Sequence, residues 1–348
     1  MIHSDDSENH YHKYLNKENH YMKKLFIPLI LAFTVLAGAC GNETTQQNSA
    51  ANAAANTSSE GTANQTGGND SAGTETASGT VTYQSENGPI EIPAQPKRIV
   101  ALSYAPNVVA LGGTLVGVDT WTMNNPLFTE KLKDVAIVSE DNPEQIFALE
   151  PDLIIAGSHM KNLDKLSDIA PTIVYTWGKL DYLAQQVEIG KVLNKEAEAK
   201  AWVEDFTKRA KAAGEEIKAK IGKDATVSVL EYDTKNFYVF GDNWARGTEL
   251  LYQMMELNMP EKAKQDALGP GYYTLSNEII PEYAGDYIVL SQNKEAQNEF
   301  LQSNTWKNIP AVKNGHVIEI DTAASTYSDP ITLEYLLGIF KEGFLSLP

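Results

Sequence analysis

Short apolar runs alternate with stretches of helical periodicity from residue 81 to the end of the chain. The runs are rich in Val, Ile, Leu and aromatic residues, and their lengths suit strands that are buried on both faces. The predicted strands are Arg98–Ser103, Leu115–Val118, Val135–Val138, Leu153–Ala156, Thr172–Tyr175, Val227–Leu230, Phe237–Phe240, Tyr287–Leu290 and His316–Ile320. This alternation predicts an α/β fold with mainly parallel sheets.

A long helical segment divides this pattern into two parts. Residues 194–221 are rich in Ala, Lys and Glu, Trp202 and Phe206 give them an apolar stripe at helical spacing, and Gly222 ends them. We therefore predict two Rossmann-like α/β lobes joined by a single long helix. The predicted boundaries are 83–193 for the N-terminal lobe, 194–222 for the linking helix and 223–348 for the C-terminal lobe.

A repeated spacing of acidic residues suggests that the two lobes are related. Glu144 precedes Asp152 by eight residues, and Glu278 precedes Asp286 by the same eight, each time before a predicted buried strand. One such glutamate at the start of a helix is explained by the helix dipole alone. Two glutamates at equivalent places favour a matched pair of exposed carboxylates, one on each lobe.

The chain begins with a different kind of sequence. Residues 25–39 are apolar and follow the basic start Met22-Lys23-Lys24. They are too short for a comfortable membrane span but suit the apolar region of a signal peptide, which we place at 22–39. Residues 1–21 are polar and are predicted to be an extension upstream of the native start.

Cys40 follows the small residues Gly38 and Ala39, an arrangement that resembles the lipidation motif of bacterial lipoproteins. The resemblance implies that Cys40 carries a lipid anchor. Residues 41–80 contain no Val, Ile, Leu, Met or aromatic residue. Such a segment buries too little apolar surface to offset its ordering entropy, so residues 40–82 are predicted to be a disordered tether.

Charge and motif content exclude several functions. The formal net charge is -18, which argues against a nucleic-acid partner and against electrostatic binding to anionic lipid. Phosphate-binding loops, nucleophile elbows and zinc-protease motifs are absent. Past the tether the histidines are His159 and His316, so no metal site and no enzymatic activity are predicted.

Aromatic residues follow several predicted strands, where open α/β sheets bind ligands. Any one of them could equally pack a core. These residues are Tyr104, Tyr175, Trp177, Trp244 and Tyr327, and Tyr238 lies within the predicted strand before Trp244. Arg246 lies beside Trp244, after a strand that ends at Gly241. Aromatic walls with one guanidinium suit a flat-sided, largely uncharged ligand with exposed oxygens.

Four short segments carry a resemblance to a known family. The segments 96–100 and 142–155 resemble the helix-linked (class III) periplasmic-binding-protein class, in particular the iron-siderophore-binding lipoproteins of ABC importers. The segments Trp244-Ala245-Arg246-Gly247 and Thr176-Trp177-Gly178-Lys179 are similar to its ferric-hydroxamate branch.

The resemblance implies a role for each matching residue. Arg246 would donate hydrogen bonds to hydroxamate oxygens, Tyr238 and Trp244 would form aromatic walls, and Trp177 and Tyr327 stand where other aromatic residues line such sites. Glu144 and Glu278 would dock the lobes onto arginines of the permease dimer. The expected protein is a monomer, lipid-anchored on the extracytoplasmic face of the cell membrane, and it hands its ligand to a permease with an ATPase.

The choice of ligand also rests on charge. A ferric tris-catecholate is trianionic and would need several basic side chains, whereas a ferric tris-hydroxamate is nearly neutral at iron. The siderophore fills the iron coordination sphere, so no protein metal ligand and no cofactor are expected. Alternatives are a catecholate, haem, for which a tyrosine ligand is available, or cobalamin. An extracellular hydrolase and an adhesion protein are the rivals from other classes.

Overall fold

The computed structural model of the chain describes residues 79–293, 296 and 298–347. All of them belong to one compact unit, Thr76–Pro348. The predicted extension 1–21, signal peptide 22–39 and Cys40 lie outside the described residues. The first strand, β1, begins at Thr80. The predicted end of the tether at residue 82 is therefore too late in the sequence.

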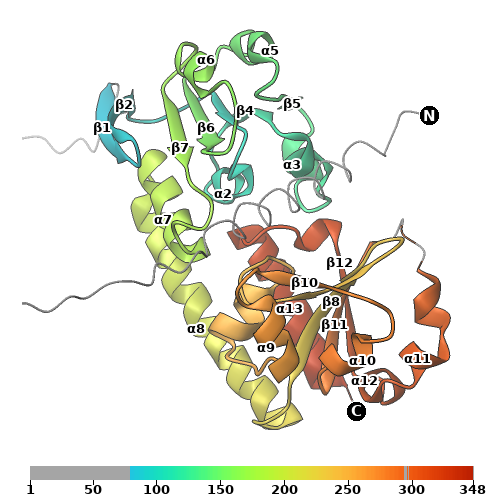
Figure 1. Cartoon of the computed structure of the whole chain (residues 1–348). Coiled ribbons are helices and arrows are strands. Elements are labelled where there is room, and N and C mark those ends of the chain that lie inside the picture. Colours follow the sequence, from blue (N-terminus) through green and yellow to red (C-terminus); the bar gives the residue numbers. More distant parts are fainter. Residues whose placement is uncertain (1–78, 294–295, 297, 348) are drawn as a thin grey trace, which may run out of the picture. The chain divides into compact units, whose positions relative to one another are not determined.

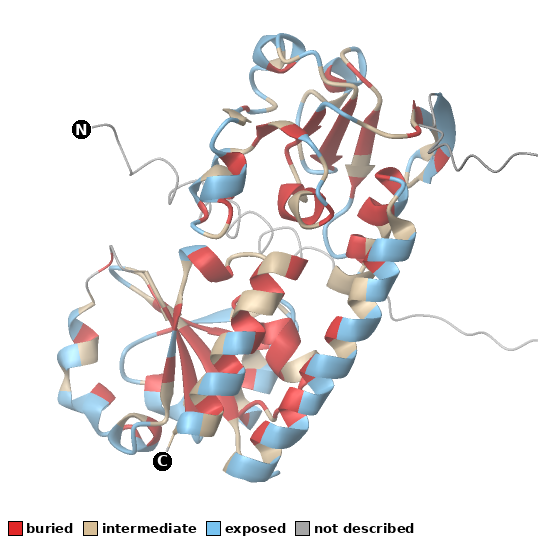
Figure 2. Ribbon diagram, turned by 180° about the vertical axis from the view of Figure 1, so that it is seen from behind, coloured by how far each residue is buried: buried red, intermediate tan, exposed pale blue. Residues whose placement is uncertain are grey.

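The N-terminal lobe is built on a five-stranded sheet in which every neighbouring pair is parallel (Figure 1). Its strand order is β5-β4-β3-β6-β7. The strands are β3 (Ile99–Ala101), β4 (Leu115–Val118), β5 (Ala136–Ile137), β6 (Leu153–Gly157) and β7 (Thr172–Tyr175). The helices are α2 (Ala105–Ala110), α3 (Thr120–Asn124), α4 (Thr129–Leu132), α5 (Pro143–Phe147), α6 (Leu163–Ser167) and α7 (Tyr182–Val192). Strands β3 and β6 are buried along their whole length, as Figure 2 shows in red.

An antiparallel hairpin of β1 (Thr80–Ser85) and β2 (Gly88–Pro93) precedes this sheet and was not predicted. It lies beside α7 in Figures 1 and 2 and packs on the lobe core through Tyr83 and Ile92. The Tyr83 hydroxyl lies 3.1 Å from the Tyr175 hydroxyl and donates a hydrogen bond of 2.9 Å to Glu188 on α7. These contacts fix the hairpin to the lobe.

The C-terminal lobe also holds a five-stranded sheet, with the order β10-β9-β8-β11-β12. The strands are β8 (Val227–Tyr232), β9 (Phe237–Phe240), β10 (Tyr272–Leu275), β11 (Tyr287–Gln292) and β12 (Val317–Asp321). β8, β11 and β12 are mutually parallel, whereas β9 is antiparallel to both of its neighbours. This sheet is therefore mixed, because only Asp233–Asn236 connects β8 to β9 and parallel neighbours need a longer crossover.

Helical segments complete the C-terminal lobe. They are the π-helix η1 (Glu249–Met254), the α-helices α9 (Glu261–Ala267), α10 (Ile280–Tyr283), α11 (Asn304–Lys307), α12 (Pro310–Lys313) and α13 (Pro330–Ser346), and the 3-10 helices η2 (Glu299–Gln302) and η3 (Ala323–Ser325). Asp329 caps α13 by accepting backbone hydrogen bonds from Ile331 and Thr332.

The predicted long helix is α8 (Glu196–Ile221), and Gly222 ends it with a φ of 99°. Its apolar stripe, which includes Phe206 and Ile217, packs into the core of the C-terminal lobe. α8 also contacts α7 of the N-terminal lobe, and α13 contacts both α8 and α2. The two lobes are therefore joined covalently by α8 and braced by α13.

The repeated spacing in the sequence, which ends at Asp152 and Asp286, corresponds to a repeat in the structure. Asp152, just before β6, accepts hydrogen bonds of 2.7 and 2.9 Å from the backbone N–H groups of Lys97 and Arg98, ahead of β3. Asp286, just before β11, accepts a hydrogen bond of 2.8 Å from the backbone N–H of Thr226, ahead of β8. In both lobes the first residues of the paired strands are in register. The two lobes thus share one local construction.

Candidate ligand-binding site

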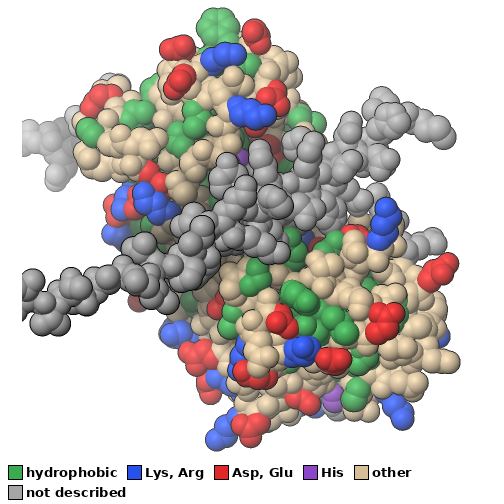
Figure 3. Space-filling model, viewed as in Figure 1, with side chains coloured by type: hydrophobic (Ala, Val, Ile, Leu, Met, Phe, Trp, Pro, Cys, Tyr) green, Lys and Arg blue, Asp and Glu red, His purple; other side chains and the backbone are tan. Residues whose placement is uncertain are grey.

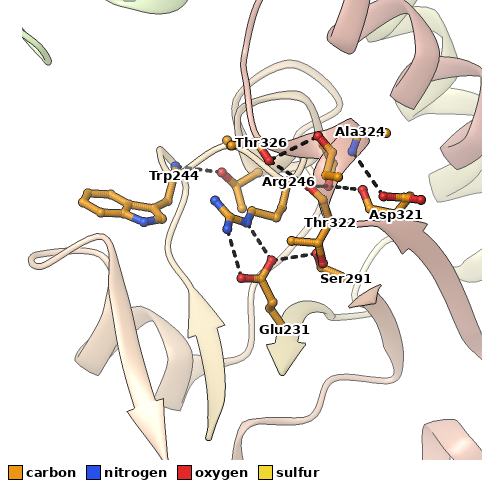
Figure 4. Close-up of polar contacts among 12 residues, drawn as sticks. Glu231, Trp244, Arg246, Ser291, Asp321, Thr322, Ala324 and Thr326 are labelled. Carbon is orange, nitrogen blue, oxygen red and sulfur yellow. Dashed lines mark hydrogen bonds and ion pairs between the residues drawn. The ribbon is translucent and has the colours of Figure 1, made fainter. Parts of the chain in front are cut away.

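The loop between β9 and η1 brings Arg246 to the carboxyl ends of the parallel strands. The loop was predicted to lie at such an edge because it follows a strand, but β9 is antiparallel, so that reason was wrong. The loop returns to the edge by its own path. The backbone N–H of Arg246 donates a hydrogen bond of 2.8 Å to the carbonyl of Ser325, and its side chain reaches Glu231 near the end of β8 (Figure 4).

Glu231 holds the Arg246 guanidinium in a two-point ion pair (Figure 4). Arg246 Nε lies 2.8 Å from Glu231 Oε2, and Arg246 Nη2 lies 2.9 Å from Glu231 Oε1. Ser291 on β11 donates a hydrogen bond of 2.7 Å to the same carboxylate, and the Phe240 ring centroid lies 5.0 Å from the guanidinium carbon. The side chains of Arg246 and Glu231 are 5% and 12% exposed, so the pair is nearly buried and fixed in orientation.

Glu231 was missed by the sequence analysis. The available signal was an acidic residue directly after the predicted buried strand Val227–Leu230, which the structure extends to Tyr232. An acid in that position needs a hydrogen-bonding or ionic partner once the strand is buried. The sequence does not say that Arg246, 15 residues away, is that partner.

The backbone that carries Arg246 is left-handed at consecutive residues. Ala245 and Arg246 have φ values of 56° and 55°, a conformation that costs energy for residues with a side chain. The buried carboxylate of Glu249 compensates by accepting hydrogen bonds from the Ala245 N–H at 3.0 Å and the Thr248 hydroxyl at 3.1 Å. Burial raises the pKa of Glu249. A buried acid thus locks the turn that aims the arginine.

Trp177 and Trp244 meet across the two lobes. Their ring centroids are 5.1 Å apart with an interplanar angle of 81°, an edge-to-face arrangement. Trp244 is partly buried and also packs on Tyr272 of β10 at 5.5 Å, whereas the Trp177 side chain is 61% exposed. The two predicted aromatic walls therefore touch each other in this structure.

Tyr327 and Tyr104 also lie where strands end. Tyr327 follows β12, yet its hydroxyl lies 3.2 Å from the Thr122 hydroxyl of the N-terminal lobe, and its ring lies 6.1 Å from that of Phe128. Tyr104 precedes α2 with a φ of 57°, and burial raises its pKa to about 12. Both rings are partly buried at the carboxyl ends of their sheets.

Tyr175 and Tyr238 are placed differently from the prediction. Tyr175 is 2% exposed and belongs to the core of the N-terminal lobe, where it supports the ring of Tyr104 at 5.6 Å. It is a packing residue, because its side chain points from β7 toward Tyr83. Tyr238 is 8% exposed, donates a hydrogen bond of 2.7 Å to Asp233 and packs on Tyr272 at 6.1 Å. Burial raises the pKa of both hydroxyls.

The predicted docking carboxylates lie on separate lobes. Glu144 is exposed in the first turn of α5, and Glu278 is exposed in the turn before α10. On the face seen in Figure 3, Lys and Arg side chains are interspersed with Asp and Glu rather than gathered into a patch. Glu144 and Glu278 are both accessible to solvent.

The described residues contain neither a metal-binding cluster nor a membrane-spanning helix. Over 79–293, 296 and 298–347, no group of three or more His, Cys, Asp or Glu side chains could hold a metal ion. Within the same ranges, no helix has both the length and the apolar character needed to cross a bilayer. A hollow lined by residues such as Leu111, Lys195 and Trp202 lies near the start of α8 and contains none of the predicted ligand residues.

Similarity to solved structures supports this arrangement. The structure of FhuD2 from Staphylococcus aureus with bound ferrioxamine B matches with a TM-score of 0.69 and 35% identity, covering 72% of this chain and 99% of that one. The FhuD protein from S. pseudintermedius matches with the same TM-score and identity, covering 78% of this chain and 100% of that one. The chain shares their fold.

Sequence relatives agree with the structural ones. The iron(3+)-hydroxamate-binding protein FhuD of Bacillus subtilis (strain 168) is 34% identical over 93% of this chain and 98% of its own. The iron(3+)-hydroxamate-binding protein YxeB of the same strain is 36% identical over 81% of this chain and 90% of its own. The periplasmic binding protein family matches residues 99–324. The chain therefore belongs to the periplasmic binding protein family.

Proposed function

We propose that this protein captures ferric hydroxamate siderophores and delivers them to an ABC importer for iron uptake. The observation that carries the proposal is the Arg246–Glu231 pair beside the aromatic pair of Trp177 and Trp244. The aromatic faces would contact the flat flanks of the chelate. The guanidinium would donate to hydroxamate oxygens while it keeps its bond to Glu231.

Charge balance favours a hydroxamate over a catecholate. The Glu231 carboxylate neutralises the Arg246 guanidinium, so the pair offers hydrogen bonds with little net charge. A ferric tris-hydroxamate, nearly neutral at iron, fits such a site, whereas a trianionic catecholate complex would be buried without compensation. In this proposal the siderophore supplies every iron ligand, and the protein needs no cofactor and performs no covalent chemistry.

The relatives support the same ligand class. Two of them are named for binding iron(3+)-hydroxamates, and a solved relative holds ferrioxamine B. We further propose that a lipid on Cys40 anchors the protein as a monomer at the extracytoplasmic face of the membrane. Glu144 and Glu278 would then contact basic residues of a permease dimer that works with an ATPase.

A tryptophan-fluorescence titration tests the ligand class. The purified protein is titrated with ferrioxamine B, ferrichrome, ferric enterobactin, haem and cobalamin. We expect quenching at the lowest concentrations with the two hydroxamates, since both tryptophan rings lie at the proposed contact surface. Tighter binding of enterobactin, haem or cobalamin would reject the hydroxamate assignment in favour of that chelate or macrocycle.

Substitution of the anchor tests the residue assignment. Arg246→Lys keeps the charge but loses the two-point geometry, and Arg246→Ala removes both. We expect Kd for ferrioxamine B to rise about tenfold for the lysine variant and about 100-fold for the alanine variant. Arg209→Lys, on the partly exposed face of α8, is the matched control and should leave Kd unchanged. Unchanged binding by both Arg246 variants would remove Arg246 from the site.

A further inference from the structure

The tip of the β1–β2 hairpin contacts the turn that carries Trp177. Glu86 lies between the two strands, and its Oε1 accepts a hydrogen bond of 3.2 Å from the backbone N–H of Thr176. Its Oε2 lies 3.2 Å from Lys179 Nζ. One carboxylate therefore binds residues on both sides of Trp177, although 90 positions separate it from Thr176.

Thr176–Lys179 form a type II turn. The Lys179 N–H donates a hydrogen bond of 3.2 Å to the Thr176 carbonyl, and Gly178 has a φ of 77° at the third position, which this turn requires. Trp177 occupies the second position, so its direction depends on the orientation of the turn as a whole. The turn is exposed, and Trp177 itself is 61% exposed, so burial in the lobe core does not fix its position.

Docking of the hairpin does not need Glu86. Tyr83 and Ile92 already bury the hairpin against the lobe core, and the Tyr83 hydroxyl bonds to Glu188. The Glu86 side chain is only 13% exposed, so placing a carboxylate there has a desolvation cost. The groups that offset this cost are the N–H of Thr176 and the ammonium of Lys179. The hairpin also lies outside the family match at residues 99–324.

We propose that Glu86 is a positioning residue for the ligand site, and that it clamps the Thr176–Lys179 turn so that Trp177 faces Trp244. The clamp couples the hairpin that follows the N-terminal segment to the exposed wall of the site. Its effect on ligand affinity rests on the proposed function, whereas its effect on the two tryptophan rings does not.

A double-mutant cycle tests the proposal through binding. Glu86→Ala and the milder Glu86→Gln are compared with Glu91→Gln, an exposed glutamate on the same hairpin that bonds only within it, to Thr82. We expect Kd for ferrioxamine B to rise about three- to tenfold for Glu86→Ala, less for Glu86→Gln, and not at all for Glu91→Gln. In a Trp177→Ala background, Glu86→Ala should change Kd less than twofold, because the residue through which it acts is gone.

Two results would overturn the proposal. One is an equal loss of affinity in the wild-type and Trp177→Ala backgrounds, which would mean that Glu86 acts on the whole lobe. The other is an unchanged Kd for both Glu86 variants in the wild-type background. A purely stabilising role would lower the melting temperature in both backgrounds and leave Kd unchanged, which is the second of these results.

A ligand-free measurement separates this proposal from the proposed function. The edge-to-face pair of Trp177 and Trp244 contributes to circular dichroism, and the spectrum of wild type minus Trp177→Phe isolates that contribution. We expect Glu86→Ala to lose most of it and Glu91→Gln to keep it. If the wild type binds no hydroxamate, the function fails while this spectrum still decides the role of Glu86. An unchanged spectrum in Glu86→Ala would overturn that role.

Discussion

The two lobes share a construction but hold their halves of the site in different ways. In the C-terminal lobe, Arg246 is buried and forms an ion pair with Glu231. The left-handed turn that carries Arg246 is held by a hydrogen bond from the Ala245 N–H to the buried Glu249 carboxylate. In the N-terminal lobe, Trp177 stands exposed on a four-residue turn that one carboxylate holds at its ends. The C-terminal half is pre-organised, and the N-terminal half depends on a contact near the surface.

This difference suggests how a ligand enters. The aromatic walls touch, so a chelate that inserts between them must displace one of them. Moving Arg246 would break a buried ion pair, which costs several kcal/mol, roughly 3–5. Moving the Trp177 turn would instead break the Glu86 contacts to Thr176 and Lys179, which lie near the surface, and the edge contact to Trp244. We therefore expect the N-terminal wall to move, with little bending of α8.

The largest effect should come from a pair of exposed carboxylates that the two lobes share. If Glu144 and Glu278 both dock the permease, each alanine substitution should reduce siderophore uptake by cells about tenfold, and the double variant roughly 100-fold. Ligand Kd should stay at the wild-type value. Glu130→Ala, an exposed acid on α4, is the control. Loss confined to one of the two positions would show that docking is asymmetric, despite the structural repeat.

Glycine substitutions test the difference between the C-terminal half of the site, with Arg246 and Trp244, and the N-terminal half, with Trp177. A Cβ on Gly271 would lie 2.3 Å from Trp244 Cε3, at a φ of 89°, so Gly271→Ala must push the indole away. Gly178→Ala, at a φ of 77°, meets no atom within 4 Å and strains only its own turn. We expect Gly271→Ala to cost about 1–3 kcal/mol of stability and raise Kd about tenfold or more. Gly178→Ala should cost about 1 kcal/mol, with a smaller rise in Kd.

Thermal unfolding and siderophore titration of both variants provide the comparison. Equal losses of affinity would contradict the view that the C-terminal half is the rigid anchor. A larger loss in Gly178→Ala would reverse it, since the Trp177 turn would then be the more demanding part of the site.

The sequence predicted the buried elements well. β4, β7 and β9 have the predicted bounds, and α8 begins two residues after the predicted Asn194. Apolar runs and a helical stripe specify such elements locally, because burial decides their composition. The predicted residues Trp177 and Trp244 are in contact, and Arg246 lies in the same loop as Trp244. Their roles toward a ligand stay predictions.

The parts that the sequence did not predict depend on contacts between distant segments. The β1–β2 hairpin buries few side chains, so its apolar pattern is weak, and β10 is mostly exposed. Neither Glu231 nor Glu86 can be matched to its partner without the fold. The orientation of β9, however, was available in the sequence: the gap between Leu230 and Phe237 is too short for a parallel crossover.

The smallest predicted effect concerns the pKa values of Glu86 and Glu249, which are shifted in opposite directions in the native state. Burial acts to raise the pKa of Glu86, but the hydrogen bonds from Thr176 and Lys179 outweigh it and lower the pKa from its ordinary value of 4.5. Burial raises the pKa of Glu249, against the hydrogen bond from Ala245. The unfolded chain therefore binds more protons than the native state at Glu86, and fewer at Glu249.

Melting temperatures between pH 3 and pH 7 test this difference in variants that remove each titration. The stability that wild type gains over Glu86→Gln should be present above about pH 4.5 and disappear as the pH falls through the lowered native pKa, with a size of about 0.5–1 kcal/mol. Wild type relative to Glu249→Gln should change in the opposite direction, with its contribution present below about pH 4.5 and lost as the pH rises through the raised native pKa. If the two stability differences changed with pH in the same direction, Glu86 beside the Trp177 turn and Glu249 beside Arg246 would be in electrostatically similar environments. The contrast between a solvent-facing N-terminal half and a buried C-terminal half would then lose its physical basis.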